Sequence, residues 1–141
     1  LLHDSGTTIG YYNHHKHSFY LILNSSINGL SHKELLLSAA ISASHRNNSY
    51  VFPYLKYACL ISKNDLNIID KIGILLRIAE NLDIDRQTYI HDIKVKFDKN
   101  FVTIFLYSKE NLSLEIEQAE KSIRKFREIY DRNLVFKAIN D

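Results

Sequence analysis

The stretch NDLNIIDKIGILLRIAENLDIDR, residues 64–86, has the clearest periodicity in the chain. Its apolar residues recur at steps of three and four, at Leu66, Ile69, Ile72, Leu76, Ala79 and Leu82. This spacing places them on one face of an α-helix. Asn64 or Asp65 is a suitable N-cap, because a short side-chain oxygen can accept a hydrogen bond from a free backbone N–H. The stretch therefore predicts a long amphipathic helix.

The periodicity changes from 3.6 to 2 after this helix, near Arg86. Residues 93–97, IKVKF, alternate apolar and lysine side chains, and FVTIFLY follows at 101–107 after a short turn. Such alternation on both sides of a turn predicts a β-hairpin. An amphipathic helix is then predicted over 112–130 and a last strand over 133–139. We therefore expect a small β-β-α-β unit in residues 87–141.

Helices are also predicted before residue 64. Ser31 followed by Glu34 forms a capping-box sequence, which predicts a helix that begins there and ends near residue 45. The fold class is therefore mostly α, with a helical bundle over residues 1–86 and a small α+β appendage over 87–141. Because the chain starts on an apolar pair, as if inside an element, we expect it to be part of a longer protein.

The composition limits the classes of partner. The 141 residues carry a formal net charge of +2, so a polyanion site must come from local clustering, and we expect no nucleic-acid partner. No apolar run reaches the roughly 20 residues that span a bilayer, so we expect no membrane partner. The single cysteine, Cys59, has apolar neighbours, which predicts a buried, reduced thiol in a cytoplasmic protein.

Histidines and carboxylates follow one another near the ends of the predicted helices. His3 and Asp4 are adjacent, and together they offer the nitrogen and oxygen ligands that divalent metals bind. Other elements must supply further ligands, and the candidates are His14, His15, His17, His45, Glu80 and Asp83. A helical bundle builds a site in this way, although a solvated polar surface explains the same residues.

A phosphate site is an equally physical interpretation of the same region. Lys16, Arg46 and Arg77 supply positive charge, and arginine can hold phosphate oxygens with two hydrogen bonds. The neighbouring histidines can become charged beside a polyanion, because their ordinary pKa lies near neutrality. Lys94 and Lys96 are most simply the solvated side of a strand. No glycine-rich phosphate loop or nucleophile elbow is present.

Two stretches resemble a known family. LLHDSGTTIGYYNHHKHSFYLILNS at 1–25 and INGLSHKELLLSAAISASHR at 27–46 resemble the C-terminal half of the exopolyphosphatase / guanosine pentaphosphate phosphohydrolase (Ppx/GppA phosphatase) family. LLRIAENLDIDR at 75–86 is similar to a later helix of that family. The resemblance covers residues 1–86, and residues 87–141 fit the small terminal domain by pattern.

The resemblance implies an HD-like helical domain that lacks its N-terminal part. In this family the N-terminal ribonuclease-H-like domains carry catalysis with Mg, so we expect the present chain not to be catalytic by itself. Its implied role is to contact inorganic polyphosphate or guanosine pentaphosphate and to support a homodimer. The expected phosphate-binding residues are His14, His15, Lys16, His17, Arg46 and Arg77.

The alternative is a metal-dependent HD phosphohydrolase that acts on a nucleotide or a phosphoester. The metal ligands would be His3, Asp4, His45 and Glu80. Catalytic HD enzymes take a first histidine from a helix upstream of the HD pair, and this chain starts after that position. They also use an aspartate where this sequence has Glu80. Both departures favour the accessory role.

Overall fold

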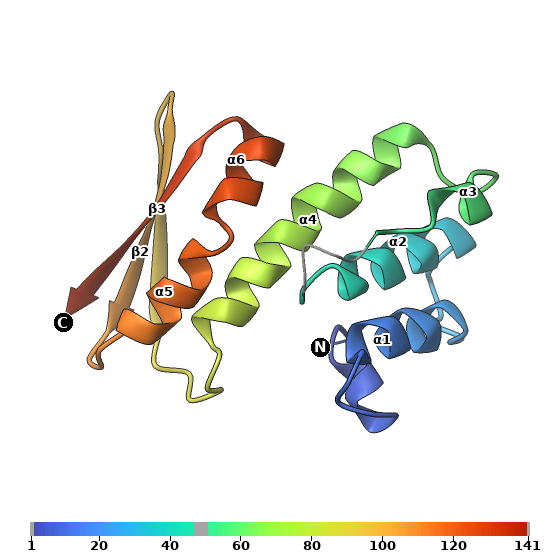
Figure 1. Cartoon of the computed structure of the whole chain (residues 1–141), viewed down its shortest axis with the longest axis horizontal. Helices are drawn as coiled ribbons and strands as arrows, with labels where there is room; N and C mark the ends of the chain where they lie inside the picture. Colours follow the sequence, from blue (N-terminus) through green and yellow to red (C-terminus); the bar gives the residue numbers. More distant parts are fainter. Residues whose placement is uncertain (1, 47–50, 141) are drawn as a thin grey trace. The chain divides into compact units, whose positions relative to one another are not determined.

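The structure is a computed structural model that describes residues 2–46 and 51–140. The chain forms two compact units, residues 1–76 and 77–141. The first unit holds the helices η1 (Ser5–Thr8), α1 (His14–Leu23), α2 (His32–Ala43), α3 (Tyr54–Tyr57) and most of α4 (Lys63–Leu82) (Figure 1). The helix predicted over 64–86 is confirmed as α4, which begins in the first unit and ends in the second.

The core of the first unit lies along α2. Leu36, Ala39 and Ala40 are fully buried, and they pack against Ile22 of α1 and Ile69 of α4 in two adjoining clusters. Two of the three α2 residues are alanines, and small side chains let neighbouring helices approach closely.

Capping boxes fix the starts of α2 and α4. The predicted box is confirmed at Ser31, which accepts from the Glu34 backbone N–H while the Glu34 carboxylate accepts from the Ser31 N–H. At α4 the predicted N-cap is wrong, because Ser62 lies at that position. The Ser62 N–H donates to Asp65 Oδ2 at 2.7 Å, and Asp65 N–H donates back to Ser62 Oγ at 3.3 Å.

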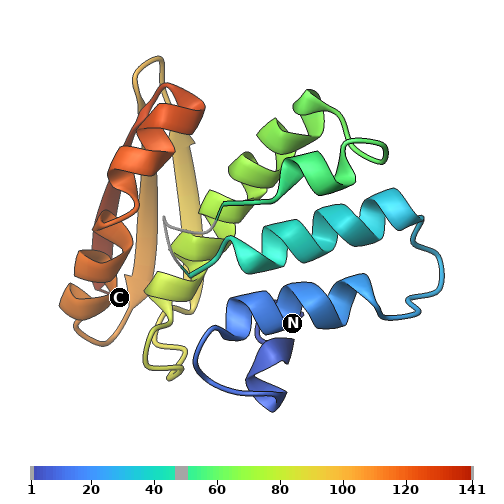
Figure 2. The same cartoon turned by 45° about the vertical axis from the view of Figure 1, so that its right-hand side comes forward.

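The second unit is a three-stranded sheet covered by helices. Its elements are β1 (Asp92–Phe97), β2 (Phe101–Ser108), α5 (Ser113–Glu120), α6 (Ile123–Tyr130) and β3 (Asn133–Asn140). The strand order is β1-β2-β3, with an antiparallel first pair and a parallel second pair. Helices α5 and α6 lie on one side of the sheet (Figure 2).

The predicted fold class, mostly α with a small α+β appendage, is confirmed. One detail differs, because the helix expected over 112–130 is two helices joined at Lys121 and Ser122. Ser122 is buried there, and the Asn81 side chain donates to Gln118 O at 3.2 Å across the joint. In the described part of the chain, no helix is both long and apolar enough to cross a membrane.

The burial predicted for Cys59 is wrong, because its thiol is exposed. Helix α3 is a single turn without a buried residue. Of the apolar neighbours that suggested burial, Ala58 and Leu60 are exposed and Tyr57 is half-buried, whereas Ile61 is buried in the core. The residues on either side of the thiol are therefore at the surface, although Ile61 is not.

Gly6 gives a test of how η1 docks on α1. A Cβ at Gly6 would lie 2.1 Å from His14 O and 2.4 Å from Ser18 N, so one of the two backbones would have to move. We expect Gly6→Ala to destabilise the fold by about 1–3 kcal/mol, the usual cost of overpacking. Urea unfolding followed by circular dichroism measures this change.

Gly10→Ala is the matched control, because no atom lies within 4 Å of its added Cβ. We expect its free energy of unfolding to stay within about 0.5 kcal/mol of the unchanged chain. Equal effects of the two substitutions would contradict the close approach at Gly6.

Asp65 makes stability depend on acid pH. The Lys33 ammonium, 2.8 Å from Asp65 Oδ2, and then the hydrogen bonds from Ser62 lower the pKa of Asp65 from 3.8 to about 2. The folded state therefore favours the carboxylate, and this contribution to stability is complete above pH 3.8 and lost as the pH falls toward about 2.

Asp65→Asn removes that contribution, so its destabilisation should be largest at neutral pH and should shrink below pH 3.8. Chemical unfolding at a series of pH values measures the difference. Asp70→Asn, at an exposed position of the same helix, is the control. A destabilisation by Asp65→Asn that stays constant with pH would rule out this linkage.

Candidate functional site

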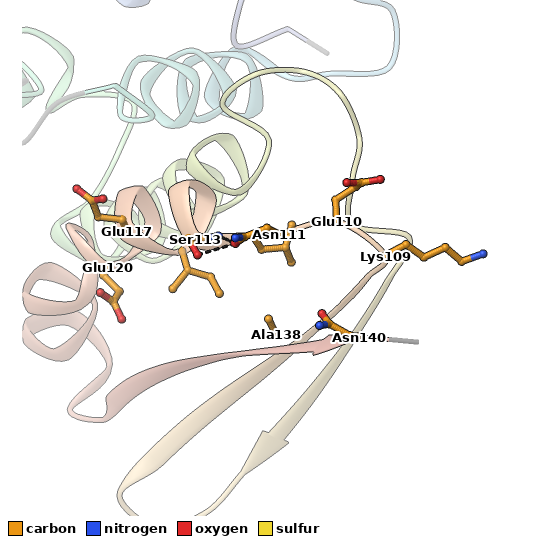
Figure 3. Close-up of a pocket in the computed structure, with 10 residues that line it drawn as sticks. Lys109, Glu110, Asn111, Ser113, Glu117, Glu120, Ala138 and Asn140 are labelled. Carbon is orange, nitrogen blue, oxygen red and sulfur yellow. Dashed lines mark hydrogen bonds between the residues drawn. The ribbon is translucent and has the colours of Figure 1, made fainter.

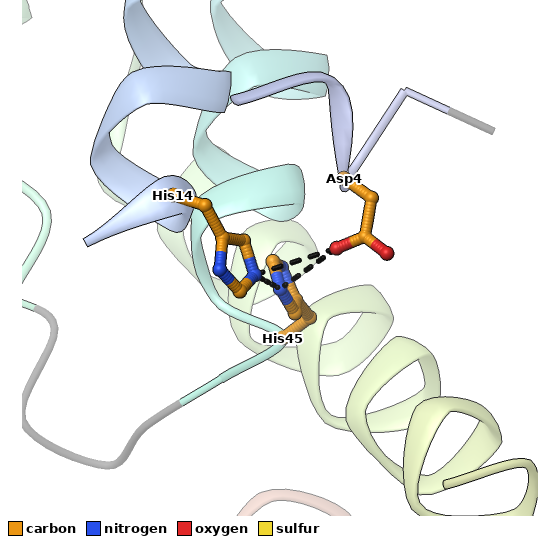
Figure 4. Close-up of side chains that lie close together, drawn as sticks. All are labelled: Asp4, His14 and His45. Carbon is orange, nitrogen blue, oxygen red and sulfur yellow. Dashed lines mark hydrogen bonds and ion pairs between the residues drawn. The ribbon is translucent and has the colours of Figure 1, made fainter. Parts of the chain in front are cut away.

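Asp4, His14 and His45 converge from three separate elements (Figure 4). Asp4 precedes η1, His14 is the first residue of α1, and His45 follows the end of α2. The Nε2 atoms of the two histidines are 2.9 Å apart, and Asp4 Oδ1 lies 3.4 Å from the first and 3.8 Å from the second. The histidines are 5 % and 2 % exposed, so the two imidazole rings are shielded from water.

The docking of η1 on α1 brings Asp4 to the histidines. The Gly6 N–H donates to Ser18 Oγ at 2.8 Å, and the Ser18 hydroxyl donates to His3 O at 2.5 Å. Ser18 is fully buried one turn after His14 on α1. A single hydroxyl thus ties the residues on either side of Asp4 to the helix that carries His14.

A chain of hydrogen bonds runs through the two rings. Arg46 Nη1 lies 2.7 Å from His14 Nδ1, and because a guanidinium only donates, this nitrogen must accept. His14 then carries its proton on Nε2 and donates it to His45 Nε2. His45 in turn donates from Nδ1 to Ser42 O. In this state both rings are neutral and each proton has an acceptor.

The same atoms fit a divalent cation. Ligand atoms about 2.0–2.2 Å from a metal ion lie about 3.0–3.5 Å from one another, close to the separations among Asp4 Oδ1 and the two Nε2 atoms. Imidazole nitrogen and carboxylate oxygen suit the transition metals and zinc. His14 would then carry its proton on Nδ1, which lies 3.0 Å from Tyr11 O. The backbone carbonyls of Tyr11 and Ser42 would hold both rings in the ligating tautomer.

A pocket of about 240 Å³ opens beside this cluster. It is lined by Tyr12, Asn13 and His15 at the start of α1 and by Arg46, which follows the end of α2. The Arg46 guanidinium lies 4.7 Å from the centre of the Tyr11 ring, and its Nη1 also donates to Tyr11 O at 3.3 Å. The pocket therefore presents a positioned cation at the positive end of a helix dipole, which favours an anionic ligand.

His15 is half-buried in the wall of this pocket. Burial, followed by the nearby His14, His45, Lys16 and Arg46, lowers its pKa below the ordinary 6.5. The ring is therefore neutral at pH 7 and acts as a hydrogen-bonding group there. The fixed positive charge of the pocket comes from Arg46.

The other predicted residues are placed as follows. Lys16 is exposed on α1 and His17 is half-buried on the same helix. The His3 Nε2 lies 3.8 Å from Asp4 Oδ2, and its ring centre is 5.1 Å from that of His45. Arg77 and Glu80 lie on the part of α4 that belongs to the second unit, and burial lowers the pKa of Arg77. Asp4 and His45 of the predicted metal set therefore meet in the cluster with His14. His15 and Arg46 of the predicted phosphate set line the pocket.

Sequence reasoning missed the part that Tyr11, Tyr12 and Asn13 take in the site. It listed His14 both among the phosphate-binding residues and among the candidate metal ligands, and the structure turns this ring inward to His45. The adjacent histidines at 14 and 15 gave no signal for which one turns inward, because that depends on the left-handed backbone of Asn13, with a φ of 58°, at the start of α1.

The second unit has a larger pocket of about 660 Å³ between α5 and the end of β3 (Figure 3). Its rim combines Lys109 with Glu110, Glu117 and Glu120, and these side chains are exposed. Because both signs of charge are present at the rim, the pocket has no evident preference for one class of ligand, and we assign it none.

Comparisons with known proteins bear on the identity of the chain. A search of curated proteins finds no match. Residues 1–125 match the family described as Ppx/GppA phosphatase, domain III, and this match extends through the first unit into α6. Most of the chain is therefore covered, and the chain belongs to the Ppx/GppA phosphatase family.

Proposed function

We propose that this chain is the accessory region of an exopolyphosphatase-family hydrolase and that it contacts inorganic polyphosphate or guanosine pentaphosphate. The contact is made in the pocket of Tyr12, Asn13, His15 and Arg46. Catalysis belongs to the ribonuclease-H-like domains that the family resemblance implies. The observation that carries the proposal is the position of Arg46, held at a pocket beside the N-terminus of α1.

The donors of Arg46 support a phosphate ligand. In the described part of the chain, both of its hydrogen bonds use Nη1, to Tyr11 O and to His14 Nδ1. Nη2 and Nε are therefore available for phosphate oxygens, which arginine binds in a bidentate fashion. The Tyr11 ring below the guanidinium fixes its plane, so little side-chain freedom is lost when a ligand binds.

The neighbouring side chains extend the contact along a chain of phosphates. His15 can donate from its ring to one phosphate, and the exposed Lys16 is close enough in sequence to reach the next. The mouth of the pocket is formed by Tyr12, which is 86 % exposed. This arrangement suits a long, repeating anion better than a small ligand that must be enclosed.

A second candidate function rests on the convergence of Asp4, His14 and His45. It is a metal-dependent HD phosphohydrolase, in which these three residues hold a divalent cation and Arg46 with His15 orients a phosphoester. A bound divalent cation would supply Lewis-acid polarisation of a phosphate oxygen. The metal ligands proposed here are Asp4, His14 and His45, and His3 stands beside them.

The family resemblance also implies a homodimer, and we propose that this region takes part in it. Sedimentation velocity at increasing protein concentration tests that role directly. A monomer at every concentration would argue against it.

Arg46→Ala should weaken binding of long-chain polyphosphate to this chain by about tenfold or more, the usual cost of losing charge-assisted hydrogen bonds. His15→Ala should have a smaller effect in the same direction, because its ring is neutral. Isothermal titration calorimetry with polyphosphate of defined length measures both. The control is Lys56→Ala, which removes a positive charge at an exposed position of α3. Affinity that is unchanged by Arg46→Ala would refute the pocket assignment.

His14→Ala and His45→Ala should each abolish stoichiometric binding of Zn²⁺ or Mn²⁺, because each removes one of the three ligand atoms that converge in this cluster. Elemental analysis after chelation, reloading and dialysis measures the metal content. His32→Ala is the control, because His32 is exposed at the start of α2. If the unchanged chain retains no metal after reloading, the hydrogen-bonded state of the cluster is the functional one and the enzymatic candidate fails.

A further inference from the structure

One face of the sheet in the second unit carries a row of aromatic side chains. Phe101, Phe105 and Tyr107 alternate with inward-facing residues along β2, the central strand. Since side chains two residues apart point to the same face, these three share one side of the sheet with Thr103. Phe105 and Tyr107 are therefore neighbours about 7 Å apart.

Lysines flank this row on both neighbouring strands. Lys94 of β1 and Lys137 of β3 both pair with Phe105, and Lys96 of β1 pairs with Thr103. Directly paired residues lie on the same face, so the lysines and the aromatic rings form one surface. We call Phe101, Phe105, Tyr107, Lys94, Lys96 and Lys137 the aromatic–lysine face.

The opposite face of the sheet is the one that α5 and α6 cover (Figures 1 and 2). The residues that alternate with the aromatic row, Val102 and Leu106, are 6 % and 0 % exposed, and Leu134 of β3 is equally buried. In contrast, Phe101 is 42 % exposed, the three lysines are exposed, and Phe105 and Tyr107 are half-buried. The aromatic–lysine face is therefore the side of the sheet that no described helix of this unit covers.

The cations lie directly above the rings. Lys94 Nζ is 4.7 Å from the centre of the Tyr107 ring, and Lys137 Nζ is 5.9 Å from the centre of the Phe105 ring. Among the residues of the three strands that point to this face, the only acidic one is Asp92, at the end of β1. The surface thus combines flat apolar rings with a local excess of positive charge.

We propose that the aromatic–lysine face binds single-stranded nucleic acid. Unpaired bases stack on exposed aromatic rings, and lysines beside them neutralise the phosphates that link the bases. Sheet-based domains that bind RNA use exposed aromatic side chains on central strands in this way. Here Phe105 and Tyr107 provide the stacking positions, and lysines on both edges follow the backbone.

The composition of this face distinguishes a polynucleotide from a plain polyanion such as polyphosphate. A chain of phosphates has no flat apolar group to place on Phe105 or Tyr107, so the rings would contribute nothing to its affinity. The near-neutral charge of the whole chain predicts no nucleic-acid partner. That net charge is a sum over the whole chain, however, and it does not show that three lysines lie around three aromatic rings on this one face. On binding, a base replaces the ammonium above each ring, and the exposed lysine turns to the adjacent phosphate at little cost.

The probe is a fluorescein-labelled oligouridylate of about 12 nucleotides, titrated with the whole chain and followed by fluorescence anisotropy. Three phosphate contacts predict that log K falls with log salt concentration with a slope of about −2. A duplex of the same length should bind at least about tenfold more weakly, because its bases are not free to stack.

Phe105→Ala and Tyr107→Ala should each weaken binding about tenfold or more. Phe97→Ala is the matched control, because Phe97 is 66 % exposed at the edge of the other face, and it should leave affinity unchanged.

The double substitution of Lys94 and Lys96 by alanine should reduce the slope of log K against log salt concentration to about −0.7 without affecting the fold. Removing Lys121 and Arg124, on the helical side, should leave the slope unchanged.

Several results would overturn the proposal. The proposal fails if the oligonucleotide does not bind, or if Phe97→Ala and Phe105→Ala weaken its binding equally. It also fails if the duplex binds as tightly as the single strand. If Arg46→Ala abolishes oligonucleotide binding, the oligonucleotide binds in the phosphate pocket and not on this face. If Arg46→Ala still binds the oligonucleotide, a separate binding surface is supported. Self-association that Lys94→Glu abolishes, without oligonucleotide binding, would make the face a contact between copies of this chain.

Discussion

The close approach of η1 to α1 at Gly6 is the constraint on which the site depends. The absence of a side chain at Gly6 lets two backbones lie at a distance that a Cβ would forbid. The buried hydroxyl of Ser18 then accepts from the Gly6 N–H and donates to His3 O. Asp4 lies between these two tethered residues. Its position opposite His14 thus depends on backbone packing as well as on the contacts of its carboxylate with the two imidazole rings.

A divalent cation in the histidine cluster would compete with protons for the same atoms. When His14 donates from Nε2 to His45, its Nδ1 must accept from Arg46. When Nε2 ligates a cation, Nδ1 must carry the proton, and this proton would face a guanidinium that only donates. Arg46 would then turn toward the pocket that it shares with His15. Occupancy of the cluster by a cation would therefore be linked, through one imidazole ring, to the orientation of Arg46, the residue proposed to bind phosphate.

The two units concentrate positive charge in different ways. In the first unit one arginine is fixed over a tyrosine ring at a helix N-terminus, which suits a localised contact with phosphate oxygens. In the second unit, lysines on two strands surround a row of rings on an open sheet face. The net charge of +2 reflects neither arrangement, because acidic side chains elsewhere on the surface cancel the sum.

The sequence by itself determined the long helix, the hairpin, the last strand and the capping box at Ser31, because each depends on contacts between near neighbours. The family is also recognisable from the sequence, because residues 1–25, 27–46 and 75–86 resemble it. Only the tertiary structure decided that His14 turns inward while His15 lines a pocket, that Cys59 is exposed, and which side of β2 the helices cover. Those outcomes depend on what residues far away in the sequence pack against, and the spacing of residues along one segment does not contain that information.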